Sequence, residues 1–420
     1  MTKKVIIIFV SVFMAAVLFA GGFVLGFNIT GVGDFFSRFT GGVAGTTQTD
    51  SQGPAQAQTD SSASLDAETK SISDTIGFIS ANAITVKTRQ ELVTAAIEGM
   101  LSSLDDKHAE YFPKDEYSKI MDSYSGTTSG IGIVVTVNDK QQIIIVNTIE
   151  DTSAFEKGLK AGDIITGVNG TNVEGVALEK VVALIKGQEG TTVKITVFRT
   201  SENKNISFDV ERRRFYVPNF YASILEENIV YIQYADFQDQ GAQKLEEKLK
   251  TMVNGQTTGI ILDLRNNLGG ILDDAVGLCD LFLDSGTVVT VKGRNNYKDS
   301  FEEFKAEKGG YTKIPMIVLI NGYSASASEL TAGALKDLGR ATLIGEKSYG
   351  KGTVQILEML SDGSGLKFTT AKYYLPSGVT IDGTGIQPDI TVVLKPEDTV
   401  DLQLNKALEE IKTMAGAIKK

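Results

Sequence analysis

The chain has 420 residues and a formal net charge of −11 at pH 7. This acidic balance disfavours nucleic acid as a partner, because phosphate backbones bind basic surfaces. The length predicts roughly two or three domains. One histidine, His108, and one cysteine, Cys279, cannot complete a Cys/His zinc site, and a lone cysteine excludes an intramolecular disulfide. We therefore expect no metal and no other cofactor.

The first 33 residues predict a membrane anchor. Lys3 and Lys4 precede an uncharged stretch, and its apolar core, Val5–Phe27, is long enough to cross a bilayer about 30 Å thick at about 1.5 Å per residue. The two lysines should stay cytoplasmic, so that the rest of the chain lies outside the membrane. A signal peptide that is cleaved to release a secreted protein is the alternative, with a weak cleavage site at 18–22.

Residues 34–64 are predicted to form a flexible linker. From Thr40 onward they are rich in Gly, Thr, Gln, Ser and Ala and contain almost no bulky apolar residue. Residues 65–122 then carry apolar residues at helical spacing, which predicts an N-terminal helical region. A polar segment, Leu104–Phe112, ends this region and holds His108, which we expect to be structural rather than catalytic.

Residues 123–200 are predicted to form a second, compact unit. It opens with SGIGIVV at 129–135 and continues with GLKAGDIITGVNG at 158–170. A helix is expected at Leu178–Ile185 and a closing strand at Thr192–Arg199. The glycine-containing motifs resemble the signature of PDZ domains, which implies a small β-barrel with helices that is inserted into the chain.

The SGIGI segment resembles the carboxylate-binding loop of a PDZ domain. With glycines at two positions, the backbone N–H groups of Gly130, Ile131, Gly132 and Ile133 would converge on the C-terminal carboxylate of a peptide, while the adjacent strand pairs with that peptide. The alternative is that these glycines only make the backbone more flexible where a strand begins. The resemblance implies that protein substrates are recognised through C-terminal or extended segments.

Residues 201–395 show strands and helices in alternation. Apolar runs predict strands at Ile229–Tyr234, Gly259–Leu264 and Ile314–Ile320, and helical patterns separate them. Such alternation indicates parallel βαβ units, with active groups at the C-terminal ends of the strands. Residues 396–420 contain a last predicted helix.

A turn of small residues, Ser324–Ser328, follows the third of these strands and precedes a predicted helix at Glu329–Leu338. A serine hydroxyl at such a turn lies beside the N–H groups of the helix start, which is the arrangement that an acyl-transfer nucleophile requires. Ordinary N-capping of the helix is the alternative. Because His108 lies far upstream, the candidate base is a lysine whose pKa is lowered by burial, and Lys351 lies in the next Gly-rich loop.

That loop also suggests a second alternative, a nucleotide-binding P-loop. Gly345–Lys351 matches the first seven positions of GxxxxGK, but the eighth residue is Gly352, whereas a P-loop needs a Ser or Thr there to reach Mg²⁺. A P-loop also opens a helix, and Thr353–Leu360 has the pattern of a strand. We therefore expect no nucleotide partner.

The turn SASASE and the loop GEKSYGKGTVQ resemble the catalytic region of the carboxyl-terminal processing peptidases, also called tail-specific proteases. The resemblance extends over nearly the whole chain outside the N-terminal linker. It implies that Ser326 is the nucleophile, that Lys351 is the general base and that Gln355 orients the lysine. The separation of the serine and the lysine, 351 − 326 = 25 residues, also fits the family pattern.

A further motif, DLRNNLGG, resembles another specific loop of the family. It implies that a backbone N–H of Gly269 or Gly270 joins that of Ala327 in an oxyanion hole, and the choice between the two glycines stays open. The implied fold is an α/β catalytic core of βαβ units with a mixed sheet, ClpP/crotonase-like, with the inserted PDZ domain and helical terminal segments. In relatives these terminal helices build a homodimer.

The predicted function is that of a membrane-anchored serine endopeptidase acting outside the cytoplasmic membrane. It would cleave protein substrates with a Ser-Lys dyad assisted by Gln355. A non-catalytic PDZ scaffold built on an inactive protease fold is the alternative class, and the intact Ser326, Lys351 and Gln355 argue against it.

Overall fold

The computed structural model describes residues 60–138, 140–295, 298–307, 309–395 and 397–418. The expected membrane anchor, Val5–Phe27, lies outside these residues, as does most of the expected linker. Within the part of the chain that is described, no helix is both long enough and apolar enough to span a bilayer.

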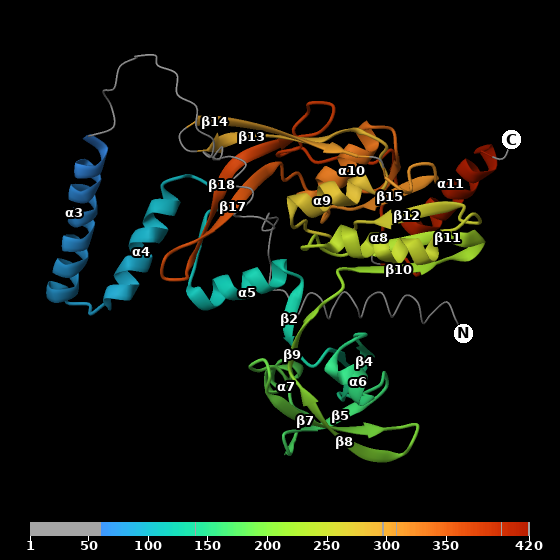
Figure 1. Cartoon of the computed structure of the whole chain (residues 1–420), viewed down its shortest axis with the longest axis horizontal. Helices are drawn as coiled ribbons and strands as arrows, with labels where there is room; N and C mark the ends of the chain where they lie inside the picture. The colour runs from blue at the N-terminus through green and yellow to red at the C-terminus, as the bar shows by residue number, and fades with distance from the viewer. Residues whose placement is uncertain (1–59, 139, 296–297, 308, 396, 419–420) are drawn as a thin grey trace, which may run out of the picture.

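The N-terminal region is mostly helical; its first two helices project away from the main body (Figure 1), whereas its short strand pairs with a strand of that body. Its elements are α3 (Asp60–Asn82), α4 (Arg89–Ser102), β1 (Glu110–Phe112) and α5 (Lys114–Tyr124). The first helix includes residues 60–64, which the composition places in the linker, because serine and aspartate favour a helix start as well as a loop. Thr88 and Glu91 form a capping box that fixes the start of α4.

The expected PDZ unit folds around one sheet in the order β3-β4-β5-β7-β8, with β6 beside β5. Its elements are β3 (Ile133–Val137), β4 (Ile143–Thr148), α6 (Ser153–Lys157), β5 (Ile164–Val168), β6 (Thr171–Asn172), α7 (Leu178–Ile185), β7 (Thr192–Arg199) and β8 (Lys204–Glu211). The predicted closing strand is therefore followed by one more strand, which pairs with it along its whole length. A buried ion pair between Arg199 and Asp163, with an N–O distance of 2.7 Å, ties the end of β7 to the loop before β5.

Two short strands connect this unit to the rest of the molecule. β2 (Thr127–Gly130) leads into it and β9 (Arg213–Tyr216) leads out, and the two pair antiparallel. Figure 1 shows them as a narrow stalk between the PDZ unit and the larger body.

The larger body is built on a six-stranded sheet in the order β10-β11-β12-β15-β16-β19. These strands are β10 (Phe220–Ile224), β11 (Ile229–Tyr234), β12 (Gly259–Asp263), β15 (Met316–Ile320), β16 (Thr342–Gly345) and β19 (Ile390–Thr391), and a 3₁₀ turn, η1 (Glu226–Asn228), joins the first two. All neighbours from β11 to β19 run parallel, whereas β10 is antiparallel to β11. The expected parallel units with a mixed sheet are therefore present.

Helices cover both faces of this sheet. Those on one face are α8 (Gly241–Met252), α9 (Leu272–Asp280) and α10 (Ala327–Asp337), and α11 (Leu402–Ile418) covers the other. Along β12, Ile260 and Leu262 belong to the first core and Ile261 to the second. Because alternate side chains of a strand point to opposite faces, a strand covered on both sides must be apolar throughout.

A second sheet completes the body and is antiparallel. It contains β1, β13 (Gly286–Asn295), β14 (Lys298–Ala306), β17 (Thr353–Met359) and β18 (Gly365–Tyr374). β18 is central, because it pairs with β17 on one edge and with β1 and then β13 on the other. The two sheets meet at the loops that precede α10 and β17, where the predicted catalytic residues lie.

Candidate active site

Ser326 lies at the turn between β15 and α10, in a backbone conformation that few side chains adopt. Its φ is 56° and its ψ is −115°. A non-glycine residue in this region is strained by about 1 to 3 kcal/mol and persists only when its surroundings hold it. Neighbouring groups do so, because the N–H of Ala325 and the hydroxyl of Ser328 both donate to the carbonyl of Asn267, at 3.0 and 2.8 Å. Such a turn is typical of a nucleophile on a strand-to-helix corner.

Lys351 lies in the loop between β16 and β17 and is only 2% exposed. Burial, together with the charge of Lys367, lowers its pKa from 10.5 to about 8. The carboxylates of Asp106 and Glu329 oppose this effect. A substantial fraction of the neutral amine is therefore available near pH 8, as a lysine base requires.

One buried carboxylate joins the two predicted catalytic residues. One oxygen of Glu329 accepts hydrogen bonds from the backbone N–H groups of Ser326 (2.9 Å) and Lys351 (2.8 Å). Its other oxygen accepts from the hydroxyl of Ser348 (2.5 Å) and the N–H of Gly350 (2.7 Å). Burial raises the pKa of Glu329, although these four bonds favour its ionised form. The carboxylate therefore fixes the serine turn and the lysine loop relative to each other.

A buried tyrosine makes the same connection from the other side. The hydroxyl of Tyr373, on β18, is within hydrogen-bonding distance of the carbonyl oxygens of Ser326 and Lys351. Sequence reasoning missed both bridging residues. The Ser-x-x-Glu spacing of a capping box gives a signal for Glu329, whereas nothing local to β18 marks Tyr373.

Gln355 lies on β17, 2% exposed, at a β-bulge that begins after Val354. Its side-chain Nε2 donates to the hydroxyls of Thr353 (2.8 Å) and Thr369 (3.1 Å). Its Oε1 is buried and has no hydrogen-bond partner among the described residues. The two threonines thus fix the amide and leave its oxygen as an acceptor.

The glycine loop after β12 lies directly against the serine turn. A Cβ added to Gly269 would come within 2.9 Å of the Cβ of Ser326 and 3.0 Å of the nitrogen of Ala327. The structure therefore places Gly269 beside Ser326 and Ala327. The N–H of Gly269 already donates to Oδ1 of Asn267 at 2.8 Å, so this N–H is engaged within its own turn.

Gly270 is held by a segment that follows β11. It forms an isolated parallel bridge with Phe237, and the N–H of Ile271 donates to the carbonyl of Phe237 at 2.9 Å. The φ of Gly270 is 147°, and an added Cβ would lie 2.1 Å from that carbonyl oxygen. Only glycine fits at this position.

The four residues predicted to bind a peptide carboxylate lie outside this site, at the entrance to the PDZ unit. Gly130 ends β2, Ile131 is buried in the core of the unit, and Ile133 begins β3. Gly132 has a φ of 85°, and its carbonyl accepts from the N–H of Ile149. β3 is the outermost strand of its sheet within the described residues, and such an edge is where an extended peptide adds to a sheet.

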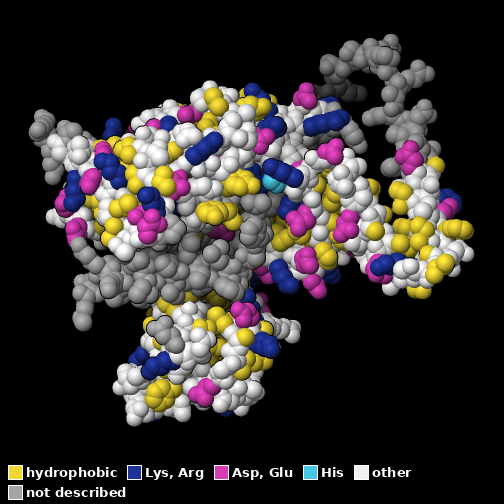
Figure 2. All heavy atoms as spheres, turned by 180° about the vertical axis from the view of Figure 1, so that it is seen from behind, with side chains coloured by type: hydrophobic (Ala, Val, Ile, Leu, Met, Phe, Trp, Pro, Cys, Tyr) yellow, Lys and Arg dark blue, Asp and Glu magenta, His cyan; other side chains and the backbone are white. Residues whose placement is uncertain are grey.

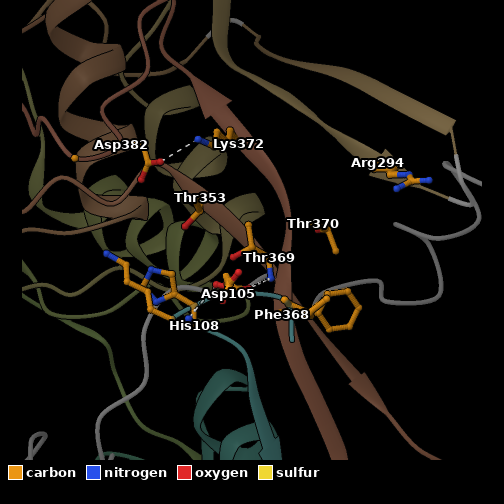
Figure 3. A pocket seen from close by; sticks show the side chains of 13 residues that line it. Asp105, His108, Arg294, Thr353, Phe368, Thr369, Thr370, Lys372 and Asp382 are labelled. Carbon is orange, nitrogen blue, oxygen red and sulfur yellow. Dashed lines mark hydrogen bonds and ion pairs between the residues drawn. The ribbon is translucent and has the colours of Figure 1, made fainter. Parts of the chain in front are cut away.

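A cavity of about 1020 Å³ lies beside the lysine end of the site. Figure 3 shows Asp105 and His108, on the turn after α4, facing Thr353 and Thr369 of the β17–β18 hairpin. Burial lowers the pKa of His108, and the charge of Lys351 lowers it further. The histidine is thus near the site, and no hydrogen bond joins it to Ser326 within the described chain.

The loop that resembles a P-loop does not lead into a helix. Residues 346–352 connect β16 to β17, and β17 pairs with β18 along its length. A phosphate cradle needs the N-terminus of a helix at this position, so the nucleotide alternative finds no support here.

Comparison with known proteins matches two parts of the chain to described families. Residues 228–392 match peptidase family S41, and residues 119–198 match the PDZ domain. The carboxy-terminal-processing protease of Bartonella bacilliformis is 38% identical over 314 residues, which cover 74% of this chain and 71% of that protein. The carboxy-terminal processing protease CtpA of Bacillus subtilis is 36% identical over 305 residues, which cover 72% of this chain and 64% of that protein.

A solved structure of a photosystem II D1 C-terminal processing protease also aligns with this chain. The identity is 26% and the TM-score is 0.45, with 76% of this chain and 85% of that chain covered. The fold, the peptidase match and the PDZ match together define the class, a serine-type protease with a PDZ domain. The chain belongs to the family of carboxy-terminal processing proteases, its residues 228–392 match peptidase family S41, and the resemblance seen in its motifs is confirmed.

Proposed function

We propose that this chain is a membrane-anchored serine endopeptidase in which Ser326 and Lys351 form a catalytic dyad. The observation that carries the proposal is the carboxylate of Glu329, which accepts the backbone N–H groups of both residues. A strained serine and a buried lysine fixed by one shared acceptor are arranged for nucleophilic catalysis.

The reaction proceeds through an acyl-enzyme. The neutral amine of Lys351 takes the proton of Ser326 as Oγ attacks the peptide carbonyl, and the tetrahedral oxyanion is stabilised by two backbone N–H groups. We assign these to Ala327 and Gly270, because the N–H of Gly269 is engaged by Asn267. The Lys351 ammonium then protonates the leaving amine. Water attacks the ester with Lys351 again as base, which releases the acid and restores Ser326.

Gln355 orients the lysine in this proposal. Its Nε2 is held by two threonine hydroxyls, so its Oε1 presents a fixed, buried acceptor. A positioned acceptor of this kind would hold the amine in one rotamer and reduce the entropy lost in the transition state.

The PDZ unit delivers substrate in this proposal. A substrate's C-terminal carboxylate would be bound by the N–H groups of Gly130 to Ile133, and its extended chain would add to the free edge of β3. Deleting the unit should therefore raise the KM for substrates with a free C-terminus more than it changes kcat, and it would also show whether the unit gates the site.

The anchor places this activity at the membrane. Val5–Phe27 would span the bilayer with the N-terminus in the cytoplasm and the catalytic part outside. Fractionation of cells that make the full-length chain, with an added protease acting from outside, tests this. Recovery of the protein only in the medium would favour a cleaved signal peptide.

A second copy of the chain is the proposed partner of the N-terminal helices. Apolar side chains lie exposed along α3, along α4 and on the loop between them (Figure 2), and they include Ile72, Phe78, Ile79, Ile84, Val86 and Met100. Phe78 is 72% exposed and Ile84 is fully exposed. Homodimerisation through these terminal helices would bury this apolar surface away from water. Sedimentation of the parent and of Phe78→Asp should give a dimer and a monomer, respectively.

Cleavage of casein by the full-length chain in detergent, with EDTA present, tests the catalytic proposal. Ser326→Ala and Lys351→Ala should each abolish cleavage, whereas Lys347→Ala, at an exposed lysine of the same loop, should not. Cleavage that persists in Ser326→Ala would refute the assigned nucleophile. A parent that cleaves neither casein nor peptides with apolar C-termini would favour the non-catalytic PDZ scaffold.

A further inference from the structure

Strand β18 has a gap along one of its edges. β17 pairs with it from Gly365 to Lys372 and so occupies the other edge. On the gapped edge β1 pairs with 365–367 and β13 with 371–374. Within the described chain, residues 368–370 therefore have no strand beside them on that edge. A buried backbone N–H in such a gap needs another acceptor.

A side chain from the N-terminal region supplies that acceptor. Oδ2 of Asp106, on the turn after α4, accepts the backbone N–H of Thr369 at 2.6 Å, and its Oδ1 accepts the N–H of His108 at 3.0 Å. Burial alone would raise the pKa of Asp106, but these hydrogen bonds outweigh it and hold the pKa below its ordinary value. The group is therefore a carboxylate at the pH where the protease works.

The residue that Asp106 holds is itself part of the site. The hydroxyl of Thr369 accepts a hydrogen bond from Nε2 of Gln355, at 3.1 Å. The backbone of Thr369 is thus fixed by Asp106 and its side chain by the amide that we assign to orient Lys351. Figure 3 shows Thr369, on β18 of the hairpin, close to Asp105 on the turn after α4.

The charge of Asp106 also acts on the base directly. Five charged or titratable groups interact electrostatically with Lys351, and they come from three elements: Asp106, Lys107 and His108 from the turn, Lys367 from β18 and Glu329 from α10. Lys367 is paired with Glu110 of β1, which partly offsets its charge. Asp106 and Glu329 are the carboxylates that favour the ammonium form of the lysine.

We propose that Asp106 is a positioning residue of the active site, which holds Gln355 through Thr369 and places a negative charge beside Lys351. The N-terminal helical region thereby completes the half of the site that contains the base. This inference rests on the proposed function of Ser326 and Lys351, and it adds to that function a role for a segment that lies about 220 residues before the nucleophile, 326 − 106 = 220.

The geometric and the electrostatic parts of this role can be separated by substitution. Asp106→Ala removes both, so plateau kcat should fall by about 10- to 100-fold, as expected when a catalytic group is misplaced, with a smaller change in KM. Asp106→Asn can keep an oxygen on the Thr369 N–H, with its amide nitrogen then facing the N–H of His108, and it loses the charge, so plateau kcat should recover in part. The pH at which the rate of this variant reaches half its plateau should lie below that of the parent, because the ammonium form of Lys351 has lost a stabilising negative charge.

Thr369→Val supplies the complementary change. It keeps the N–H that Asp106 accepts and removes the hydroxyl that Gln355 donates to, so plateau kcat should fall with less change in the half-maximal pH. Asp105→Asn is the matched control, since it removes the same charge one residue away and asparagine tolerates its φ of 51°. Its profile should match that of the parent.

The experiment follows cleavage of fluorescent casein by the full-length chain from about pH 6 to about pH 10. Thermal unfolding of each variant is measured in parallel. The proposal would be overturned if Asp106→Ala and Asp106→Asn both match the parent in two quantities, the plateau kcat within about twofold and the pH at which the rate is half-maximal. This holds even if their melting temperatures fall. If Asp106→Ala does not fold, Thr369→Val and Asp106→Asn decide alone. Cleavage that survives Ser326→Ala would instead refute the proposed dyad, so the two failures are distinguishable.

Discussion

Replacing Lys351 by methionine should make the protein more stable while abolishing its activity. The burial of this ammonium lowers its pKa from 10.5 to about 8. At about 1.4 kcal/mol for each pKa unit, keeping the lysine charged in the folded state costs about 3 kcal/mol. Methionine has a similar length and no charge, so Lys351→Met should recover much of this free energy at neutral pH.

The gain should depend on pH in a defined direction. Below about pH 8 the lysine is protonated in both the folded and the unfolded protein, so the full cost is present. Between about pH 8 and pH 10.5 the folded protein loses the proton first and the unfolded chain still binds it. The parent therefore becomes more stable as pH rises through this window, and the advantage of methionine should shrink towards zero.

Denaturant unfolding at about pH 6.5 and about pH 10 measures this difference. Both proteins should carry Ser326→Ala, so that neither can degrade itself. The comparison of matched variants cancels the titration of tyrosines and of Cys279, whose pKa burial raises to about 12. The reasoning would be refuted if the methionine variant is no more stable than its parent at about pH 6.5. It would also be refuted if the difference in their free energies of unfolding is the same at both pH values.

Three further predictions concern the same site. The rate of casein cleavage should rise with pH and reach half its maximum near pH 8, where Lys351 loses its proton, and a flat profile from pH 6 would contradict a lysine base. Glu329→Gln should lose most activity and about 1 to 3 kcal/mol of stability, because an amide nitrogen then faces a buried N–H donor, whereas Ser348→Ala, which removes one of the four bonds, should lose less. Gly270→Ala should inactivate the enzyme by displacing the oxyanion loop, whereas Gly255→Ala, where an added Cβ meets nothing within 4 Å, should be silent in the same cleavage assay.

Much of the fold could be predicted because its periodicity is local. The runs at Ile229–Tyr234 and Leu178–Ile185 became β11 and α7 with the expected bounds. A strand that is covered on both faces must be apolar at every position, and this signal survives in the sequence without any knowledge of its neighbours. By contrast, β8 follows a four-residue turn and carries mostly polar side chains, and no pattern placed it in the PDZ sheet.

The site was predictable to the extent that its residues lie in motifs. Ser326, Lys351, Gln355 and the glycine pair stand in short, specific stretches, and the structure brings the serine, Ala327 and Gly269 into contact. Our proposal of Gly270 over Gly269 uses the hydrogen bond from the Gly269 N–H to Asn267, which only the folded turn contains.

The sequence by itself determined the family, the turn of small residues that carries Ser326, and the presence of a single histidine in the chain. The tertiary structure decided how these parts act on one another. Glu329 reaches the lysine loop, Tyr373 bridges from β18, and Asp106 fills a gap in a sheet about 260 residues further along the chain. Burial and neighbouring charges set the pKa of Lys351, and both depend on which distant segments pack around it. A local motif can therefore mark Lys351 as a candidate base, whereas the packed fold sets its pKa.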